Sequence, residues 1–446
     1  MKPLHAGAFC AAILALAATA FAAGPVLKGK QAFGDWRADR PGLVRLILPQ
    51  DLLKPAPSQS ASNSPGRAKM PRDVELRLPP GFSAELVASG IRNPRAVRVA
   101  PDGDLFVADS RANQLRVYRL APGSARPAEE SVFAGDLHQP YGIAFYPAGK
   151  PAWVYVANSN GVVRFPYKDG DLKAAGAAET VVSGIPSSRH WTRDIAFSPD
   201  GETMYLSVGS GSDAAEDIGA APQGGVERWA REKPLGYAWG PEQGRAEVRA
   251  YDPDGGNERV VATGLRNCSG MAVQPATGAL WCVVNERDGL GDDVPFEYAT
   301  AVRPGAFYGW PWYYTGANAD PRHAGQRPDL ADKVTVPDVL MQAHSAPLGI
   351  AFYEASQFPA EYRGDAFVTL HGSWNRSRRT GYKVVRLRFD AGRPTGEYED
   401  FMTGFVVSDG AVWGRPVGVA VAADGALIVT EDGAGTIWRI VWKGGA

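Results

Sequence analysis

One sequence unit returns six times between Val74 and the end of the chain. Each copy has a polar cluster, a short apolar run, a turn often spelled PDG, a second apolar run and another polar cluster. The copies begin at Ile91, Leu137, Ser188, Leu265, His344 and Gly414. Segments able to form two further strands follow each copy, such as NQLRVYRL, GVVRFPY, YKVVRLRF and GTIWRIVW. Six units of about four strands predict an all-β fold, a six-bladed β-propeller with four-stranded antiparallel blades.

The composition favours the same architecture. The chain contains 52 Gly, 35 Pro and 12 Trp, which suits many short strands and tight turns better than long helices. A β-sandwich is the alternative, but it leaves the recurrent unit unexplained. The net charge of −1 creates no overall field that would attract nucleic acid or an anionic membrane, so neither is expected as a partner.

The chain before the repeats has two parts. Residues 1–23 combine Lys2 and His5 with an apolar run and small residues that suit a signal peptidase, which predicts a cleaved secretory signal peptide. A buried N-terminal helix is the alternative. No later apolar run is long enough to cross a membrane, so we expect a periplasmic or secreted protein that is not an integral membrane protein. Residues 24–73 lack periodicity and predict an N-terminal extension or linker before a catalytic domain at 74–446.

Two cysteines follow the predicted signal peptide. Cys268 and Cys282 lie on the two facing apolar runs of the fourth copy. An oxidising compartment would permit a disulfide between them. The expected register does not place them directly opposite each other, so the sequence leaves the bond open. The chain has no C-x-x-C-H motif, which excludes a covalently attached c-type haem.

Polar groups gather at one end of the predicted hairpins. In residues 264–311, for example, an Arg-Asn pair precedes the first apolar run and an acidic stretch follows the second. The start of one strand and the end of its antiparallel neighbour lie at the same edge of a sheet, so the six copies predict one polar rim around a central axis. Its predicted members before the first strands are Arg92, Arg95, Gln139, His190, Arg266, Asn267, His344 and Arg415. Those after the second strands are Asp109, Asn158, Glu286, Asp288, His371, Trp374, Asn375, Arg376, Glu431 and Asp432.

The rim composition favours anion and cation binding over covalent hydrolysis. It has no G-x-S-x-G motif, reactive cysteine or H-E-x-x-H pair. Its arginines suit carboxylates, its acidic loop suits a hard cation held by oxygen atoms, and its histidines include a candidate base. Two long insertions, at about 210–248 and 286–335, leave from the same rim and are expected to form walls or a lid over it.

Several motifs together resemble one family. The segments GLRN, NERDGLGDD, GAFYGWP, HGSWNRS, GYKVVR and GRPVGVAVAADGALIVTED are similar to the L-sorbosone dehydrogenase branch of the soluble quinoprotein glucose dehydrogenases. The likeness runs from about residue 32 to 442. It implies a propeller that binds pyrroloquinoline quinone (PQQ) and Ca²⁺ and oxidises the C1 hydroxyl of a sugar or a hydrated aldehyde by hydride transfer to the quinone. It also implies an external electron acceptor, which would be a cytochrome, a quinone or a dye.

The resemblance assigns roles to three rim residues. His190 matches the catalytic base that takes the hydroxyl proton, which fits the usual role of histidine near neutral pH. Arg266 and Asn267 match an Arg-Asn pair that holds the cofactor near its quinone oxygens. The alternatives are a histidine that merely bonds its own loop and polar side chains that bond the strand edge.

The acidic loop is the implied calcium site. Asp288 and Gly289 match positions whose backbone carbonyls bind the ion, and Asp292 and Asp293 match a neighbouring acidic pair. A solvated acidic turn is the alternative.

The cofactor carboxylates are expected to bind arginines. Arg415 matches one such arginine, but this chain has Val417 where relatives in that family have a second one. Arg376 or Arg378 could supply the missing charge, or His371 could stand where the glucose enzymes have a lysine.

Three aromatic residues lie on the predicted rim or in an insertion that leaves from it. Tyr308, Trp310 and Trp374 could wall a planar cofactor or sugar, and core packing is the alternative for Trp310. A metal-dependent lactonase-like propeller is the rival enzyme. The non-enzymatic alternative is a secreted propeller that binds carbohydrate or protein without catalysis. The missing arginine at Val417 is compatible with this alternative.

Overall fold

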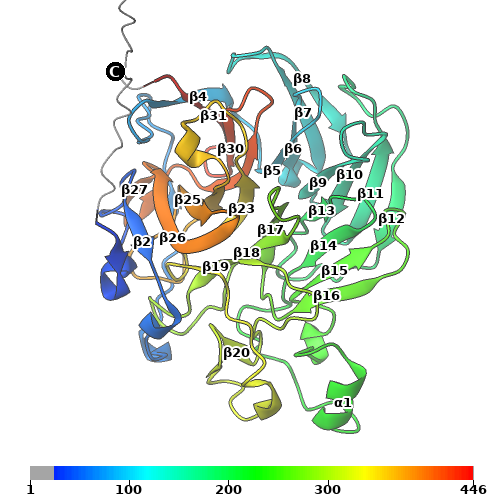
Figure 1. The fold of residues 1–446 in the computed structure, drawn as a ribbon, viewed down its shortest axis with the longest axis vertical. Helices are drawn as coiled ribbons and strands as arrows, with labels where there is room; N and C mark the ends of the chain where they lie inside the picture. Colours follow the sequence, from blue (N-terminus) through cyan, green and yellow to red (C-terminus); the bar gives the residue numbers. More distant parts are fainter. Residues whose placement is uncertain (1–24, 445–446) are drawn as a thin grey trace, which may run out of the picture.

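The computed structural model describes residues 25–444, and the predicted signal peptide lies outside them. Strands dominate these residues, which hold one α-helix, α1 (Val226–Glu232). Short 3-10 helices span Gly29–Phe33, Pro49–Asp51, Pro57–Gln59, Ser110–Ala112, Gly240–Glu242, Pro328–Leu330 and Ala360–Tyr362. None of the helices described is long and apolar enough to span a bilayer. The predicted all-β class is confirmed (Figure 1).

Six sheets each contain a run of four antiparallel strands. The first three are β5 (Pro94–Val99), β6 (Leu105–Asp109), β7 (Gln114–Leu120) and β8 (Pro127–Ala134); β9 (Gly142–Tyr146), β10 (Trp153–Asn158), β11 (Gly161–Pro166) and β12 (Glu179–Ser183); and β13 (Ile195–Phe197), β14 (Met204–Val208), β15 (Glu247–Tyr251) and β16 (Arg259–Thr263). The others are β17 (Cys268–Val273), β18 (Leu280–Val284), β19 (Glu297–Ala301) and β22 (Val339–Met341); β23 (Pro347–Phe352), β24 (Ala366–Leu370), β25 (Lys383–Asp390) and β26 (Arg393–Met402); and β29 (Pro416–Val421), β30 (Leu427–Glu431), β31 (Thr436–Trp442) and β4 (Phe82–Ala88). Every predicted hairpin is therefore the leading strand pair of one sheet.

The first strands of the six sheets lie side by side around a common centre (Figure 1). β5 contacts β9, and the contacts continue through β13, β17 and β23 to β29, which contacts β5. Glycines permit this close approach. A Cβ on Gly270 of β17 would collide with the carbonyl oxygen of Leu348 in β23. A Cβ on Gly418 of β29 would collide with the carbonyl oxygen of Arg95 in β5.

One cavity and the predicted rim lie at opposite ends of these strands. A cavity of about 380 Å³ is lined by residues near the downstream ends of all six first strands, Val99, Phe145, Phe197, Val273, Phe352 and Val421. The polar residues predicted for the rim lie at the upstream ends of the same strands and at the downstream ends of the second strands. The cavity is therefore distinct from the rim.

The N-terminal segment is more regular than its sequence indicates. β2 (Val44–Leu46) pairs with β26 and with β1 (Leu27–Lys28), so it widens the fifth sheet. β3 (Gly66–Arg67) pairs with β28 (Ala411–Val412), which also pairs with β27 (Val406–Ser408). The insertion at 286–335 holds a further hairpin of β20 (Tyr313–Tyr314) and β21 (Asn318–Ala319).

Cys268 and Cys282 form a disulfide, with their Cα atoms 5.8 Å apart. Cys268 lies opposite Val284 on β18, and Cys282 lies opposite Met271. The two cysteines are therefore diagonal neighbours and do not lie directly opposite each other, which agrees with the register expected from the sequence. Because Cys282 and Val284 share one face of β18, the diagonal still brings both sulfur atoms within bonding reach.

Candidate active site

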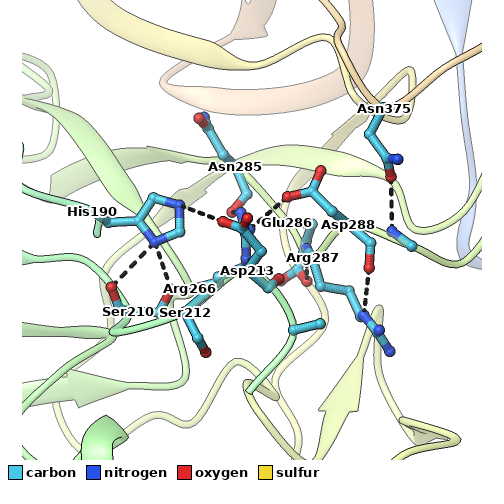
Figure 2. A network of polar contacts seen from close by, with 12 residues as sticks. His190, Ser210, Ser212, Asp213, Arg266, Asn285, Glu286, Arg287, Asp288 and Asn375 are labelled. Carbon is cyan, nitrogen blue, oxygen red and sulfur yellow. Dashed lines mark hydrogen bonds and ion pairs between the residues drawn. The ribbon is translucent and has the colours of Figure 1, made fainter. Parts of the chain in front are cut away.

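His190 lies on the loop that leads into β13, and its side chain is 17% exposed. Its Nδ1 is 2.8 Å from Ser210 Oγ and 3.1 Å from the Ser210 carbonyl oxygen. The Ser210 hydroxyl donates to the Ser212 carbonyl, and a carbonyl only accepts, so Nδ1 carries the hydrogen and Nε2 keeps its lone pair. Figure 2 shows Nε2 facing Asp213, whose Oδ1 lies 3.7 Å away. His190 therefore turns its accepting nitrogen toward the polar cluster.

Gly209 lets His190 and Asn267 approach each other. A Cβ on Gly209 would lie 2.7 Å from His190 Cβ and 2.5 Å from Asn267 Oδ1. Arg245 fixes the same turn, since Nε donates to the Gly209 carbonyl and Nη2 to the Ser210 carbonyl, both at 2.6 Å. The segment after β14 is thus shaped to hold the imidazole.

Arg266 is almost fully buried and joins acids from two loops. Its Nη2 lies 2.8 Å from Asp288 Oδ2 and 3.4 Å from Asp213 Oδ1. The guanidinium carbon lies 5.5 Å from the centre of the Trp310 ring, within cation–π range. The structure therefore brings His190, Arg266 and Asp288 together, as the hairpin geometry predicted (Figure 2).

The charges of this cluster fix its protonation states. Burial, together with the Arg266 guanidinium, holds the pKa of His190 well below its ordinary value. The imidazole is therefore neutral near neutral pH, which is the form a base requires. Burial alone would raise the pKa of Asp288, but Arg266 and His344 lower it, so this carboxylate remains charged.

A second polar cluster surrounds Asp432. His371 Nε2 lies 2.8 Å from Asp432 Oδ1, and Arg95 Nη1 lies 2.7 Å from Oδ2. Arg415 Nη2 donates to His371 Nδ1 at 2.8 Å, so Nδ1 accepts and Nε2 carries the hydrogen. Burial, and then Arg415, lowers the pKa of His371 to about 4. His371 is thus a neutral link between Arg415 and Asp432 rather than a cation.

Arg95 connects the two clusters. Its guanidinium carbon lies 5.5 Å from the Tyr141 ring centre and 5.7 Å from that of Trp191, the residue after His190. Val417 is fully buried and packs with the apolar residues Ala96, Tyr141 and Leu348. Arg95 therefore places a positive charge near the position where Val417 offers none.

The predicted calcium loop has no acidic cage. Within residues 25–444, no group of three or more His, Cys, Asp or Glu side chains is placed to hold a metal ion. The Asp288 carbonyl accepts from Arg287 Nε at 3.0 Å, and the Gly289 N–H donates to Asn375 Oδ1 at 2.7 Å (Figure 2). Gly289 has a φ of +84°, which suits glycine and turns the loop sharply at this point.

The acidic pair lies further along the same loop. Asp292 accepts from the Ser377 N–H at 3.0 Å, and Asp293 forms an ion pair with Arg376 Nη2 at 2.6 Å. Arg378 is largely exposed. Arg376 therefore neutralises Asp293 in this structure.

The three candidate aromatic walls separate into two kinds. Tyr308 is fully buried, and its hydroxyl donates to the Ala301 carbonyl at 2.5 Å. Trp310 is 3% exposed and covers Arg266. Trp374 is 40% exposed, so it alone of the three could stack on a ligand that approaches from solvent.

Comparison with protein-family models gives a match described as TrAA12-like over residues 76–297 and 319–443. The chain belongs to this family. The resemblance to the PQQ-dependent sugar dehydrogenases is thereby confirmed.

Two curated relatives of the TrAA12-like chain cover most of its length. An uncharacterized protein of Borreliella burgdorferi is 31% identical over 82% of this chain and 91% of its own. A pyrroloquinoline quinone-dependent pyranose dehydrogenase of Coprinopsis cinerea is 25% identical over 86% of this chain, which spans 56% of that enzyme.

Two solved structures have the same fold as the chain. The holo PQQ domain of the Coprinopsis pyranose dehydrogenase matches 85% of this chain and 100% of its own, with a TM-score of 0.67 and 23% identity. A calcium structure of the Trichoderma reesei family AA12 protein matches 86% of this chain and 98% of its own, with a TM-score of 0.66 and 21% identity.

The sequence did not predict two residues of the candidate site, Asp213 and Ser210. Asp213, which faces His190, lies in the insertion at 210–248, where no repeat predicts a position. Ser210 fixes the tautomer of His190 through its carbonyl and hydroxyl oxygens, and no sequence motif predicts this contact. Arg95 was placed on the rim by the hairpin geometry, but nothing in the sequence linked it to Asp432.

Proposed function

We propose that the protein is a PQQ- and Ca²⁺-dependent dehydrogenase that oxidises a sugar or a sugar-derived aldehyde, of the aldose or sorbosone type, and passes electrons to an external acceptor. One observation carries the proposal: a neutral histidine turns its accepting nitrogen into a rim that also holds buried, partly unpaired cationic and amide groups. Family membership and the likeness to the Coprinopsis PQQ domain support it.

The rim residues fit an anionic, planar cofactor. Six buried side-chain atoms among them have no hydrogen-bond partner: Arg95 Nε, Asn267 Oδ1, Glu286 Oε1, Arg376 Nε, Arg376 Nη1 and Arg415 Nε. Buried polar atoms in proteins are normally paired, so such orphans mark a place for a ligand. PQQ has three carboxylates, which Arg95 and Arg415 would bind, with Arg266 and Asn267 near the quinone oxygens.

Calcium fits this loop through oxygen atoms of the backbone. We propose that the carbonyl groups of Asp288 and Gly289 bind the ion, with Asp292 and Asp293 as nearby negative charge. Hard carbonyl and carboxylate oxygens are the ligands that calcium prefers. The calcium structure of the Trichoderma protein supports the choice of metal.

His190 would act as the base in the reaction. When bound, PQQ would supply the hydride acceptor, and Ca²⁺ would polarise its quinone oxygen. His190 Nε2 would take the proton of the substrate hydroxyl while Nδ1–H stays bonded to Ser210. Asp213, 3.7 Å from Nε2, would stabilise the imidazolium that forms. Arg266, held by Asp288, would stay fixed beside the reacting atoms.

We further propose that the six sheets are the blades of a six-bladed propeller, in a protein exported to the periplasm or secreted. The unbroken chain of contacts between first strands supports the first statement. The disulfide supports the second, because such bonds persist in oxidising compartments. N-terminal sequencing of the protein after expression in a bacterium that exports it would reveal cleavage near residue 23.

Reconstitution tests the proposed activity. Purified apoprotein should gain dye-linked oxidation of at least one aldose or sugar aldehyde when PQQ and Ca²⁺ are both added, and lose it with a chelator. Lactone hydrolysis without PQQ would support a lactonase instead. Sugar binding without turnover would support a binding protein.

A further inference from the structure

We infer that residues 56–68 of the N-terminal segment, here called the strap, position the loops that would bind the cofactor. The strap crosses three loops in turn: the one after β18 with Asp288 and Gly289, the one after β24 with His371 and Arg376, and the one before β29 with Arg415. The inference rests on the proposed function, and it assigns a role to a segment that has no chemistry of its own in the sequence.

The strap first meets the predicted calcium loop. The Ala56 N–H donates to the Leu290 carbonyl at 2.8 Å. Ala56 also lies against Gly291, where an added Cβ would be 3.4 Å from the Ala56 carbonyl oxygen. This contact begins one residue after Gly289, so movement of the strap would move the loop.

Asn375 then joins the strap to the same loop. Its Oδ1 accepts from the Gly289 N–H at 2.7 Å, and its Nδ2 donates to the Ala61 carbonyl at 2.5 Å. Both ends of the amide are used, so its orientation is fixed and the Gly289 peptide is held at a set distance from the strap. Asn375 is thus a positioning residue for the carbonyl of Asp288, which belongs to that peptide.

Asn63 fastens the strap to the loop after β24. Its backbone N–H donates to the Trp374 carbonyl at 2.7 Å, and its Nδ2 donates to the Ser377 carbonyl at 2.9 Å. Its Oδ1 accepts from Nη2 of the fully buried Arg379 at 2.8 Å. Asn63 therefore holds the chain on both sides of Arg376, through its backbone N–H before that residue and through its side chain after it.

The end of the strap runs beside the third loop. Gly66 and Arg67 pair in parallel with Ala411 and Val412, and the Ala68 N–H donates to the Val412 carbonyl at 2.9 Å. Arg415 follows three residues later. The same short segment thus fixes neighbours of the proposed metal carbonyls, of Arg376 and of Arg415.

The variant Asn63→Ala tests the inference, because Asn63 touches none of the proposed ligands. Gln357→Ala is its matched control. The Gln357 amide also joins two segments, with Nε2 donating to the Trp442 carbonyl at 2.9 Å and Oε1 accepting from the Trp442 N–H at 3.1 Å. Gln357 follows the downstream end of β23, at the opposite end of the sheets from the rim.

PQQ binding to each apoprotein in the presence of Ca²⁺ would be measured by quenching of tryptophan fluorescence. We expect Asn63→Ala to raise the Kd for PQQ by about 10-fold or more, as loss of an outer-shell partner does at metal sites, while Gln357→Ala leaves it within about 2-fold. Equal affinity in Asn63→Ala and wild type, or an equal loss in both variants, would overturn the inference. Failure of wild type to bind PQQ would instead refute the proposed function.

Hydrogen exchange gives a second readout that needs no cofactor. In apoprotein carrying Asn63→Ala, the amides of residues 286–293 should exchange faster than in wild type, while those of β20 and β21 in the same insertion should not change. Unchanged exchange at 286–293 would show that the strap does not hold this loop.

Discussion

At the residue scale, the candidate base is defined by its neighbours. Ser210 fixes the hydrogen on Nδ1 of His190, and burial with Arg266 disfavours the charged imidazole. A neutral imidazole in the right tautomer is ready to accept a proton as soon as a hydroxyl reaches Nε2. The second histidine of the rim, His371, has both nitrogens occupied and cannot serve in this way.

The titration of His190 in the apoprotein follows from this environment. Its pKa is lowered, so the group should stay neutral as the pH falls through the ordinary histidine value of about 6.5 and gain its proton only well below it. NMR of the protein labelled at histidine C2 would show this, with His190→Gln identifying the signal. Titration of that signal at or above pH 6.5 would contradict the description of the site.

At the element scale, the hairpin of β17 and β18 carries both Arg266 and the disulfide. Two short apolar runs and the intervening turn predicted this hairpin and all five others, because a strand pair with a buried face has little freedom of register. The sequence could not predict whether Cys268 and Cys282 form a disulfide, because their diagonal placement depends on the irregular pairing next to Cys268.

Loss of the disulfide should destabilise this hairpin. The bond closes a short loop, with a sequence separation of 14, so the variant with Cys268→Ala and Cys282→Ala should lose about 2–4 kcal/mol of unfolding free energy. Urea denaturation of the variant and of reduced wild type should give similar shifts. An unchanged midpoint in both would show that packing alone holds the hairpin.

The long insertions mark the limit of what the sequence predicts. Asp213 meets His190 because the chain between β14 and β15 folds back over the rim, and no period or motif constrains that path. Most contacts of Asn63 and Ala61 involve a backbone group on at least one side, and many sequences could supply such a group. Hairpin ends were predictable because strand geometry determines them, whereas loop paths depend on many weak contacts.

At the scale of the whole molecule, the N-terminal segment is joined to the fifth sheet inside the fold. Arg45 of the N-terminal segment is fully buried between Asp39 and Asp400, each at 2.7 Å, and Lys383 contacts the same two acids at 2.8 and 2.7 Å. Two cations thus balance two anions where β2 pairs with β26. This cluster anchors the segment that leads to the strap.

Removal of one partner should be costly. Arg45→Ala would leave buried Asp39 and Asp400 with only Lys383, so the unfolding free energy should fall by about 3–5 kcal/mol. The exposed ion pair of Arg37 with Asp409 provides the control, and Arg37→Ala should hardly change the urea midpoint. If both variants unfold at the wild-type midpoint, the buried cluster does not anchor the segment.

In the proposed function, the rim places PQQ beside His190. The most direct test records the visible spectrum of the protein loaded with PQQ and Ca²⁺, without oxygen, before and after a sugar or sugar aldehyde is added. In wild type, the spectrum should change to that of reduced PQQ. His190→Ala should still bind PQQ, but the bound PQQ should be reduced about 100-fold or more slowly. Equal rates of reduction in both proteins, or no binding of PQQ by wild type, would contradict the claim.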